Sequence, residues 1–99
     1  MLTITAVIRA RKGQEGVLRD ALLEVADNVR ANEPDTVGFF ISQDLENPCV
    51  FTTYERFTDL AAMDRHNGSG AVARFFGIAK PLLDGAVRLV TGSKISAKG

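Results

Sequence analysis

The chain is short of the residues from which cofactor and metal sites are built. Its 99 residues include one cysteine, Cys49, one histidine, His66, and no tryptophan. A single cysteine cannot form an internal disulfide, and a single histidine cannot supply a metal triad of two histidines and a carboxylate. No glycine-rich dinucleotide fingerprint follows the first expected strand. We therefore expect no metal and no organic cofactor.

An excess of charge of one sign is also missing. Twelve Lys and Arg balance twelve Asp and Glu, and the only close basic cluster is Arg9, Arg11 and Lys12. Without an excess positive field, a nucleic-acid partner is not expected. The apolar N-terminal stretch is too short to span a membrane and has no basic leader. We expect a single cytoplasmic domain over residues 1–99, with neither nucleic acid nor membrane as a partner.

The pattern of apolar residues alternates between the periods of strands and helices. Period-two alternation predicts strands at about residues 2–11, 37–44, 50–57 and 86–95. Apolar residues at helical spacing predict a helix over about residues 14–31, which Pro34 ends. Thr58 and Ser69 are suited to cap two shorter helices. The first should close at Asn67-Gly68, and the second should run to about Leu83 with its last turn distorted by Pro81.

This order of elements, βαββ, two short helices and a last strand, indicates an α+β fold. It fits a ferredoxin-like, four-stranded antiparallel sheet with helices on one face. The other face would remain partly apolar, because Phe40 and Tyr54 alternate with Phe39 and Glu55 along their strands. Packing of this face against an identical subunit is the simplest cover, so we expect a homodimer.

The segment from Tyr54 to His66 runs from a strand into a helix that ends near the only histidine. Leu60, Met63 and His66 lie three residues apart, which predicts that the imidazole faces inward with the two apolar side chains. An inward histidine beside a strand is a candidate for proton transfer. It is equally a candidate for a polar cap, because a histidine in the last turn interacts favourably with the helix dipole.

Several short motifs follow one another in a familiar order. They are Arg11-Lys12-Gly13 with Glu15, Glu33-Pro34, Asp44 with Pro48, Tyr54-Glu55-Arg56-Phe57 with Asp59, Ala62 and His66, and Pro81-Leu82-Leu83. In this order and spacing the chain resembles the antibiotic biosynthesis monooxygenase family of dimeric α+β barrel proteins. The resemblance covers nearly the whole domain.

The resemblance implies a pocket between sheet and helices in each subunit. Some members use it to oxidise phenolic or anthrone-like aromatics with dioxygen and no cofactor, whereas others are isomerases or haem-degrading enzymes. The haem-degrading branch uses asparagine, tryptophan and histidine at positions that fall on Ala6, His66 and Phe76, so none of the three is retained. Cofactor-free chemistry needs only a base and an apolar cavity that holds the substrate anion away from water.

Candidate site residues follow from the faces of the strands. Glu55 shares a face with Thr53 and with Phe57, whose position in the family looks toward the pocket. Desolvation among phenylalanines makes a carboxylate a stronger base, and His66 could be its hydrogen-bonding partner. We therefore predict Glu55 and His66 as catalytic residues. The predicted substrate-binding residues are Phe39, Thr53, Phe57, Met63 and Phe76.

Two other interpretations of these residues remain open. Glu55 could simply pair with a cation or a backbone donor, and the phenylalanines could be core residues. The leading functional prediction is a cofactor-independent monooxygenase or related oxidoreductase acting on a small aromatic or quinol-like substrate. The alternatives are an isomerase or other small-molecule-processing enzyme of the same fold, and a non-enzymatic dimeric protein that binds a hydrophobic metabolite.

Overall fold

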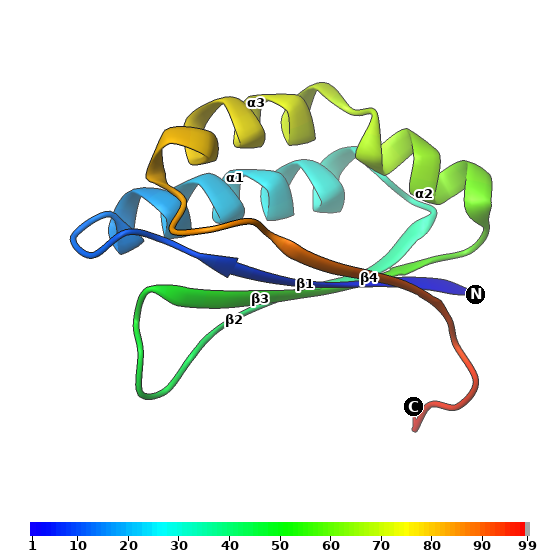
Figure 1. The fold of residues 1–99 in the computed structure, drawn as a ribbon. Coiled ribbons are helices and arrows are strands. Elements are labelled where there is room, and N and C mark those ends of the chain that lie inside the picture. The colour runs from blue at the N-terminus through cyan, green and yellow to red at the C-terminus, as the bar shows by residue number, and fades with distance from the viewer. Residues whose placement is uncertain (99) are drawn as a thin grey trace.

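The computed structural model describes residues 1–98, in which one antiparallel sheet carries the helices on a single face (Figure 1). The elements in chain order are β1 (Leu2–Arg9), α1 (Glu15–Asn32), β2 (Thr36–Gln43), β3 (Val50–Phe57), α2 (Leu60–Asn67), α3 (Gly70–Ala79), the 3₁₀ turn η1 (Lys80–Leu82) and β4 (Arg88–Ser93). The strand order is β2-β3-β1-β4. This arrangement confirms the predicted α+β, ferredoxin-like fold.

The ends of the elements show where local chemistry differs from the prediction. Asp59, not Thr58, caps α2, because its carboxylate accepts the backbone N–H of Ala62 at 2.8 Å. Ser69 caps α3 as predicted. The chain around Pro81 forms only a 3₁₀ turn, since proline has no N–H for a further α-helical bond. β4 is shorter than predicted and spans only the six residues that pair with β1.

The sheet buries every second residue of its two central strands against the helices. On β1 the buried residues of this face are Ile4, Ala6 and Ile8. On β3 they are Phe51, Thr53, Glu55 and Phe57. Ile4 pairs with Glu55, and Ala6 pairs with Thr53. A hydroxyl and a carboxyl group therefore lie in the middle of an otherwise apolar buried surface.

Two apolar clusters flank these polar groups and hold the surrounding elements together. The larger cluster joins β1 and β3 to α1 and α3, and its members include Leu18, Leu22, Phe51 and Phe75. The smaller cluster joins β1 and β3 to α2 through Ile4, Phe57, Ala62 and Met63. Because α2 packs on β3 through this smaller cluster, the end of α2 that carries His66 is fixed above Glu55.

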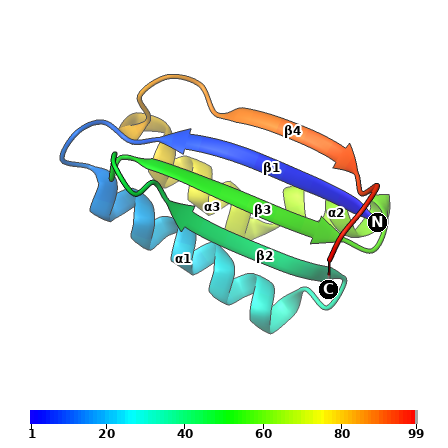
Figure 2. The same ribbon diagram turned by 90° about the horizontal axis from the view of Figure 1, so that it is seen from below.

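The other face of the sheet carries no helix, as the view from below shows (Figure 2). Phe40 and Tyr54 are paired across β2 and β3 on this face, with ring centroids 6.3 Å apart, and both are exposed. Val90 of β4 is exposed on the same face, because it pairs with Thr5. These positions agree with the predicted division of Phe40 and Tyr54 from the helix-covered face.

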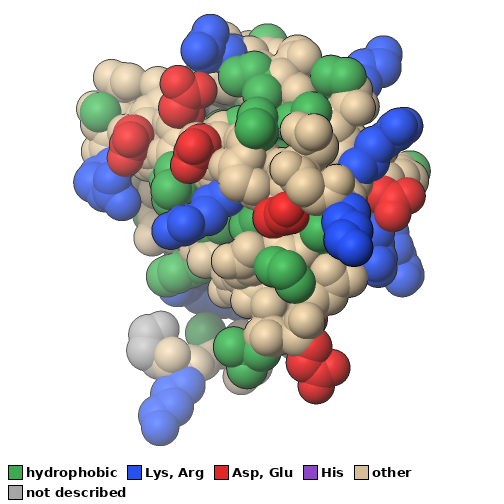
Figure 3. Space-filling model, turned by 90° about the vertical axis from the view of Figure 1, so that its left-hand side faces the viewer, with side chains coloured by type: hydrophobic (Ala, Val, Ile, Leu, Met, Phe, Trp, Pro, Cys, Tyr) green, Lys and Arg blue, Asp and Glu red, His purple; other side chains and the backbone are tan. Residues whose placement is uncertain are grey.

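Neither positive nor negative side chains predominate on the end of the molecule that holds the β1–α1 and β2–β3 loops. Basic and acidic side chains are interspersed there, with small separate apolar patches between them (Figure 3). Within residues 1–98, none of the helices has the length and apolar character needed to cross a membrane.

Candidate active site

His66 is the centre of the polar group that lies between the sheet and the helices. It occupies the last turn of α2 and is only 4% exposed, which confirms the predicted inward orientation. The expected apolar stripe is only partly right, because Leu60 is exposed while Ala62 and Met63 are buried. The cap at Asp59 starts the helix so that His66, seven residues later, faces β3.

Two carboxylates hold the imidazole, one at each ring nitrogen. His66 Nδ1 lies 2.7 Å from Glu33 Oε1, and His66 Nε2 lies 3.0 Å from Glu55 Oε1. Glu33 comes from the end of α1 and Glu55 from β3. The structure therefore joins three titratable groups from three elements, of which Glu33 is 33 positions from His66 in the sequence.

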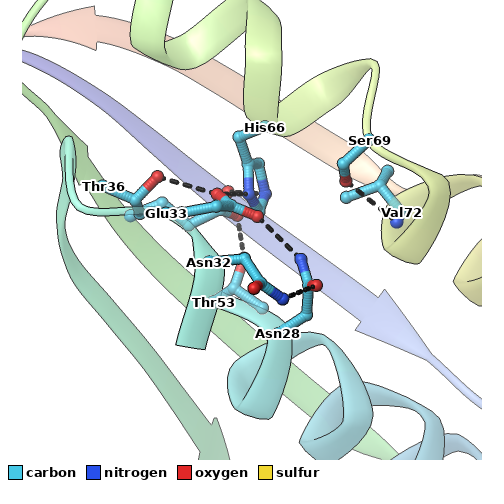
Figure 4. Close-up of polar contacts among 9 residues, drawn as sticks. Asn28, Asn32, Glu33, Thr36, Thr53, His66, Ser69 and Val72 are labelled. Atoms are coloured by element: carbon cyan, nitrogen blue, oxygen red, sulfur yellow. Dashed lines mark hydrogen bonds and ion pairs between the residues drawn. The ribbon is translucent and has the colours of Figure 1, made fainter. Parts of the chain in front are cut away.

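Both carboxylates accept further hydrogen bonds on their remaining sites. Thr53 Oγ1 donates to Glu55 Oε2 at 2.8 Å. Glu33 Oε1 accepts from Thr36 Oγ1 at 2.8 Å, and Glu33 Oε2 accepts from the Asn28 amide at 3.1 Å (Figure 4). These donors fix the orientation of each carboxyl plane relative to the imidazole ring.

Local structure explains why Glu33 reaches this position. Its backbone N–H still bonds to the Val29 carbonyl at 3.1 Å, but its φ of −124° and ψ of 76° are no longer helical. The next residue is Pro34, which disfavours helical conformation in the residue before it. The chain therefore leaves the helix at Glu33 and turns toward β2, which leaves the Glu33 side chain beside α2.

Aromatic rings enclose the imidazole on the sheet side. The ring centroid of His66 is 5.6 Å from that of Phe39 and 5.4 Å from that of Phe57. The plane of the imidazole is tilted by 52° from the ring of Phe39 and by 48° from that of Phe57. Burial among such rings lowers the pKa of an imidazole, because desolvation disfavours the charged ring. The hydrogen bonds and charges of Glu55 and Glu33 outweigh this effect, and the pKa of His66 is raised above its ordinary value of 6.5.

A cavity of about 260 Å³ lies between the sheet and the helices beside this group. Its polar lining consists of Thr53, Glu55, His66 and Asn67. Its apolar lining comes from β1, α1, β2, α3 and the chain leading through β4, and includes Ile4, Ala6, Leu22, Phe39, Val72, Phe75, Phe76 and Leu89. Phe76 and Leu89 are 45% and 59% exposed, so the cavity opens to the surface between α3 and β4.

A family model matches most of the chain, including Glu33, Glu55 and His66. Residues 1–77 match the antibiotic biosynthesis monooxygenase family, which covers β1 to most of α3. The chain belongs to the antibiotic biosynthesis monooxygenase family. A search of curated proteins finds no match.

Solved structures share the fold of this antibiotic biosynthesis monooxygenase family member at low sequence identity. Rv0793 from Mycobacterium tuberculosis is 17% identical with a TM-score of 0.90, and the match covers 99% of this chain and 98% of that one. PA3566 from Pseudomonas aeruginosa is 25% identical with a TM-score of 0.86, over 96% of this chain and 94% of that one. A solved antibiotic biosynthesis monooxygenase is 19% identical with a TM-score of 0.89, and the match covers 97% of this chain and 100% of that one.

Most of the predicted site residues of this family member meet at the cavity, and two do not. Glu55, His66, Phe39, Thr53 and Phe76 line it. Phe57 and Met63 were expected there but lie in the smaller apolar cluster with Ile4 and Ala62. Phe57 is fully buried and Met63 is 8% exposed. The ring of Phe57 packs against the imidazole without lining the cavity.

Sequence reasoning gave no role to Glu33, although the structure places it against His66. Its only signal in the sequence is the Glu33-Pro34 pair at the end of a helix, which carries no information about the distant histidine. Within residues 1–98, no cluster of three or more His, Cys, Asp or Glu side chains is arranged to hold a metal ion. The two carboxylates lie on opposite sides of the imidazole rather than converging on one point.

Proposed function

We propose that this chain is a cofactor-independent monooxygenase or related oxidoreductase for a small aromatic or quinol-like substrate. The observation that carries the proposal is the position of Glu55, a residue only 6% exposed, in the wall of an otherwise largely apolar cavity. Membership of the monooxygenase family supports the same reaction class. The proposal assigns the base to Glu55 and its hydrogen-bonding partner to His66.

The reaction starts with proton removal from an acidic phenol O–H or an activated ring CH₂ group. Glu55 accepts this proton, and the apolar wall keeps water away from the resulting anion. The electron-rich anion then reduces dioxygen directly. For a ring CH₂ group, one oxygen atom replaces the two hydrogens as a carbonyl, and the other oxygen leaves with those hydrogens as water. For a phenol, one oxygen atom becomes a second carbonyl on a ring carbon, and the other leaves as water with the hydroxyl hydrogen and the hydrogen of that carbon. A hydroquinone instead passes two electrons and two protons to dioxygen, which gives a quinone and hydrogen peroxide.

The size of the cavity selects among aromatic substrates. Its volume of about 260 Å³ is below the range of roughly 300–1,000 Å³ that is usual for sites of drug-sized ligands. A substrate of one or two rings therefore fits better than an extended polycyclic one. The rings of Phe39, Phe75 and Phe76 offer edges and faces for stacking against it.

Oxygen uptake with a panel of hydroquinones, naphthols and anthrones tests this proposal. Activity should persist after dialysis against a chelator, and the smaller compounds should react faster. Glu55→Gln keeps the shape of the side chain but removes the base, and should lower turnover by roughly 10²-fold to 10⁴-fold. Glu46→Gln, which makes the same change on the exposed β2–β3 loop, is the matched control. Equal rates for folded Glu55→Gln and a clearly active parent would refute the assignment.

One feature of the site favours a second candidate, a binding protein for a hydrophobic metabolite. Both oxygens of Glu55 already accept hydrogen bonds, from Thr53 and from His66. A carboxylate has about four lone-pair sites, so a substrate proton can still be accepted, but an oxygen already engaged by a donor is less available as a base, as in a cavity that binds a ligand without reacting with it. A parent that is inactive across the panel yet binds a naphthol in calorimetry would favour this candidate.

A further inference from the structure

Glu33 holds the second nitrogen of His66, yet it does not line the cavity. It faces a separate groove of about 640 Å³, lined also by Asn28, Asp35, Arg65 and residues at the start of α3. Its side chain is 13% exposed, whereas those of His66 and Glu55 are 4% and 9% exposed. His66 thus spans the wall between a polar groove and the apolar cavity, with one carboxylate on each side.

The other hydrogen bonds of the two carboxyl groups favour their ionised forms. Asn32 Nδ2 donates to Asn28 Oδ1 at 2.8 Å, which leaves the Asn28 amide N–H to donate to Glu33 Oε2. Thr36 donates to the other oxygen of Glu33, and Thr53 donates to the oxygen of Glu55 that His66 does not contact. Three of the four carboxyl oxygens therefore accept a hydrogen bond from a group other than His66, as oxygens of ionised carboxylates do. With both carboxyl groups ionised, both ring nitrogens of His66 are donors, and an imidazole with two N–H groups carries a positive charge.

We propose that Glu33 is a positioning residue that holds His66 as an imidazolium, so that the Nε2–H of His66 keeps Glu55 ionised as a base inside an apolar cavity. This inference rests on the proposed function, in which Glu55 accepts the substrate proton. A carboxylate alone in such a cavity would be desolvated and would tend to take up a proton from water. An adjacent imidazolium removes that tendency, and Glu33 stabilises the imidazolium from the side that the substrate does not reach.

No other charged group competes for His66 among the elements packed around it. α1 contributes Glu33 through its C-terminal end, and β3 contributes Glu55. The lining contributed by β1, β2, α3 and β4 is apolar. On the groove side, Arg65 is already bound to Asp35 at 2.9 Å. The direction of the His66 pKa, raised by both carboxylates against the effect of burial, agrees with this arrangement.

The parent protein provides the first test, which requires no variant and no substrate. Proton–nitrogen NMR of the His66 ring should show N–H protons on both nitrogens at pH values where a free imidazole is largely neutral. His66 is the only histidine, so its ring signals need no further assignment. A ring with a single N–H under these conditions would overturn the proposal.

The second test compares two substitutions that remove one negative charge from the same stretch of chain. Glu33→Gln keeps the shape and the packing but removes the charge at Nδ1, so the imidazolium should be lost at a lower pH than in the parent. Asp35→Asn, which lines the same groove but binds Arg65, should leave the titration of His66 unchanged. The proposal fails if the Glu33→Gln protein titrates like the parent, or if both variants shift equally.

Activity measurements separate this inference from the function on which it rests. Loss of the carboxylate that orients a catalytic histidine costs about 10⁴-fold in a serine protease, so we expect Glu33→Gln to lower kcat by at least about tenfold. KM should change little, because Glu33 does not line the cavity. An inactive parent would overturn the proposed function, while the NMR result would still decide whether His66 is protonated on both ring nitrogens. If Glu33→Gln has the kcat of the parent while Glu55→Gln is still impaired, the positioning role of Glu33 is wrong but the proposed function stands.

Discussion

Replacing His66 with alanine should destabilise this protein more than most single core substitutions. The change removes the group that lies between the buried carboxyl of Glu55 and the partly exposed carboxyl of Glu33, and it leaves both without their ionic partner. Removing one partner of a buried ion pair typically costs about 3–5 kcal/mol, because the remaining charge is desolvated and unpaired. Here two carboxylates are affected, so we expect a loss of at least about 3 kcal/mol. A chain of this length has a total stability of roughly 5–15 kcal/mol.

Urea unfolding followed by circular dichroism measures this loss. With a slope of about 1–3 kcal/mol per M, the midpoint should fall by at least about 1 M. The triple variant with Glu33→Gln, Glu55→Gln and His66→Ala has the same space at His66 but no unpaired charge. It should therefore recover part of the loss.

The triple variant separates electrostatic from packing effects. If it is no more stable than His66→Ala alone, the cost comes from lost packing against Phe39 and Phe57 and the electrostatic reasoning is wrong. A His66→Ala protein within about 1 kcal/mol of the parent would refute the reasoning entirely.

Three further predictions concern titration, assembly and capping. The pKa of His66 is raised in the folded state, so the stability that its protonation gives to the fold is fully present below about pH 6.5 and is lost as the pH rises through the folded pKa. Urea unfolding should therefore show a smaller difference in stability between the parent and His66→Ala at pH 9 than at pH 6. We expect a homodimer through the helix-free face, where Phe40 is exposed. Phe40→Ala should weaken dimerisation by about 2 kcal/mol, which is roughly a 30-fold higher dimer Kd in sedimentation. A parent that sediments as one chain at all concentrations would contradict this. Asp59→Ala should cost about 1 kcal/mol through loss of the α2 cap, and an unchanged unfolding midpoint would contradict it.

The fold could be predicted from the sequence because the signals that specify it are local. The alternation of Ile4, Ala6 and Ile8 marks a half-buried strand, and this pattern depends on no distant residue. The same period placed Glu55 on the helix-covered face. The predicted cap of α2 was wrong because two neighbouring residues, Thr58 and Asp59, can both accept a backbone hydrogen bond at the start of a helix.

For the site, the sequence predicts which face of its own strand or helix a side chain occupies, but not which side chains of other elements it contacts. Inward orientation of Glu55 and His66 follows from their own elements, and their contact follows from packing α2 on β3. Phe57 also faces inward, but whether an inward side chain meets a cavity or another side chain depends on how α2 sits on the sheet. Glu33 could not be found in this way, because its contact with His66 joins the end of α1 to the end of α2 across 33 positions of sequence.

The composition of the buried group argues that it serves chemistry rather than stability. A buried ion pair or triad can often be replaced by apolar residues of similar volume with no loss, or even a gain, in stability. The surrounding side chains, among them Ile4, Phe39 and Phe57, already form well-packed apolar contacts that apolar residues at positions 55 and 66 could join. Stability alone therefore gives no reason for His66 and Glu55 to lie where they do. A carboxylate kept ionised beside an apolar cavity does give one, because a general base requires both its charge and the exclusion of water around its substrate.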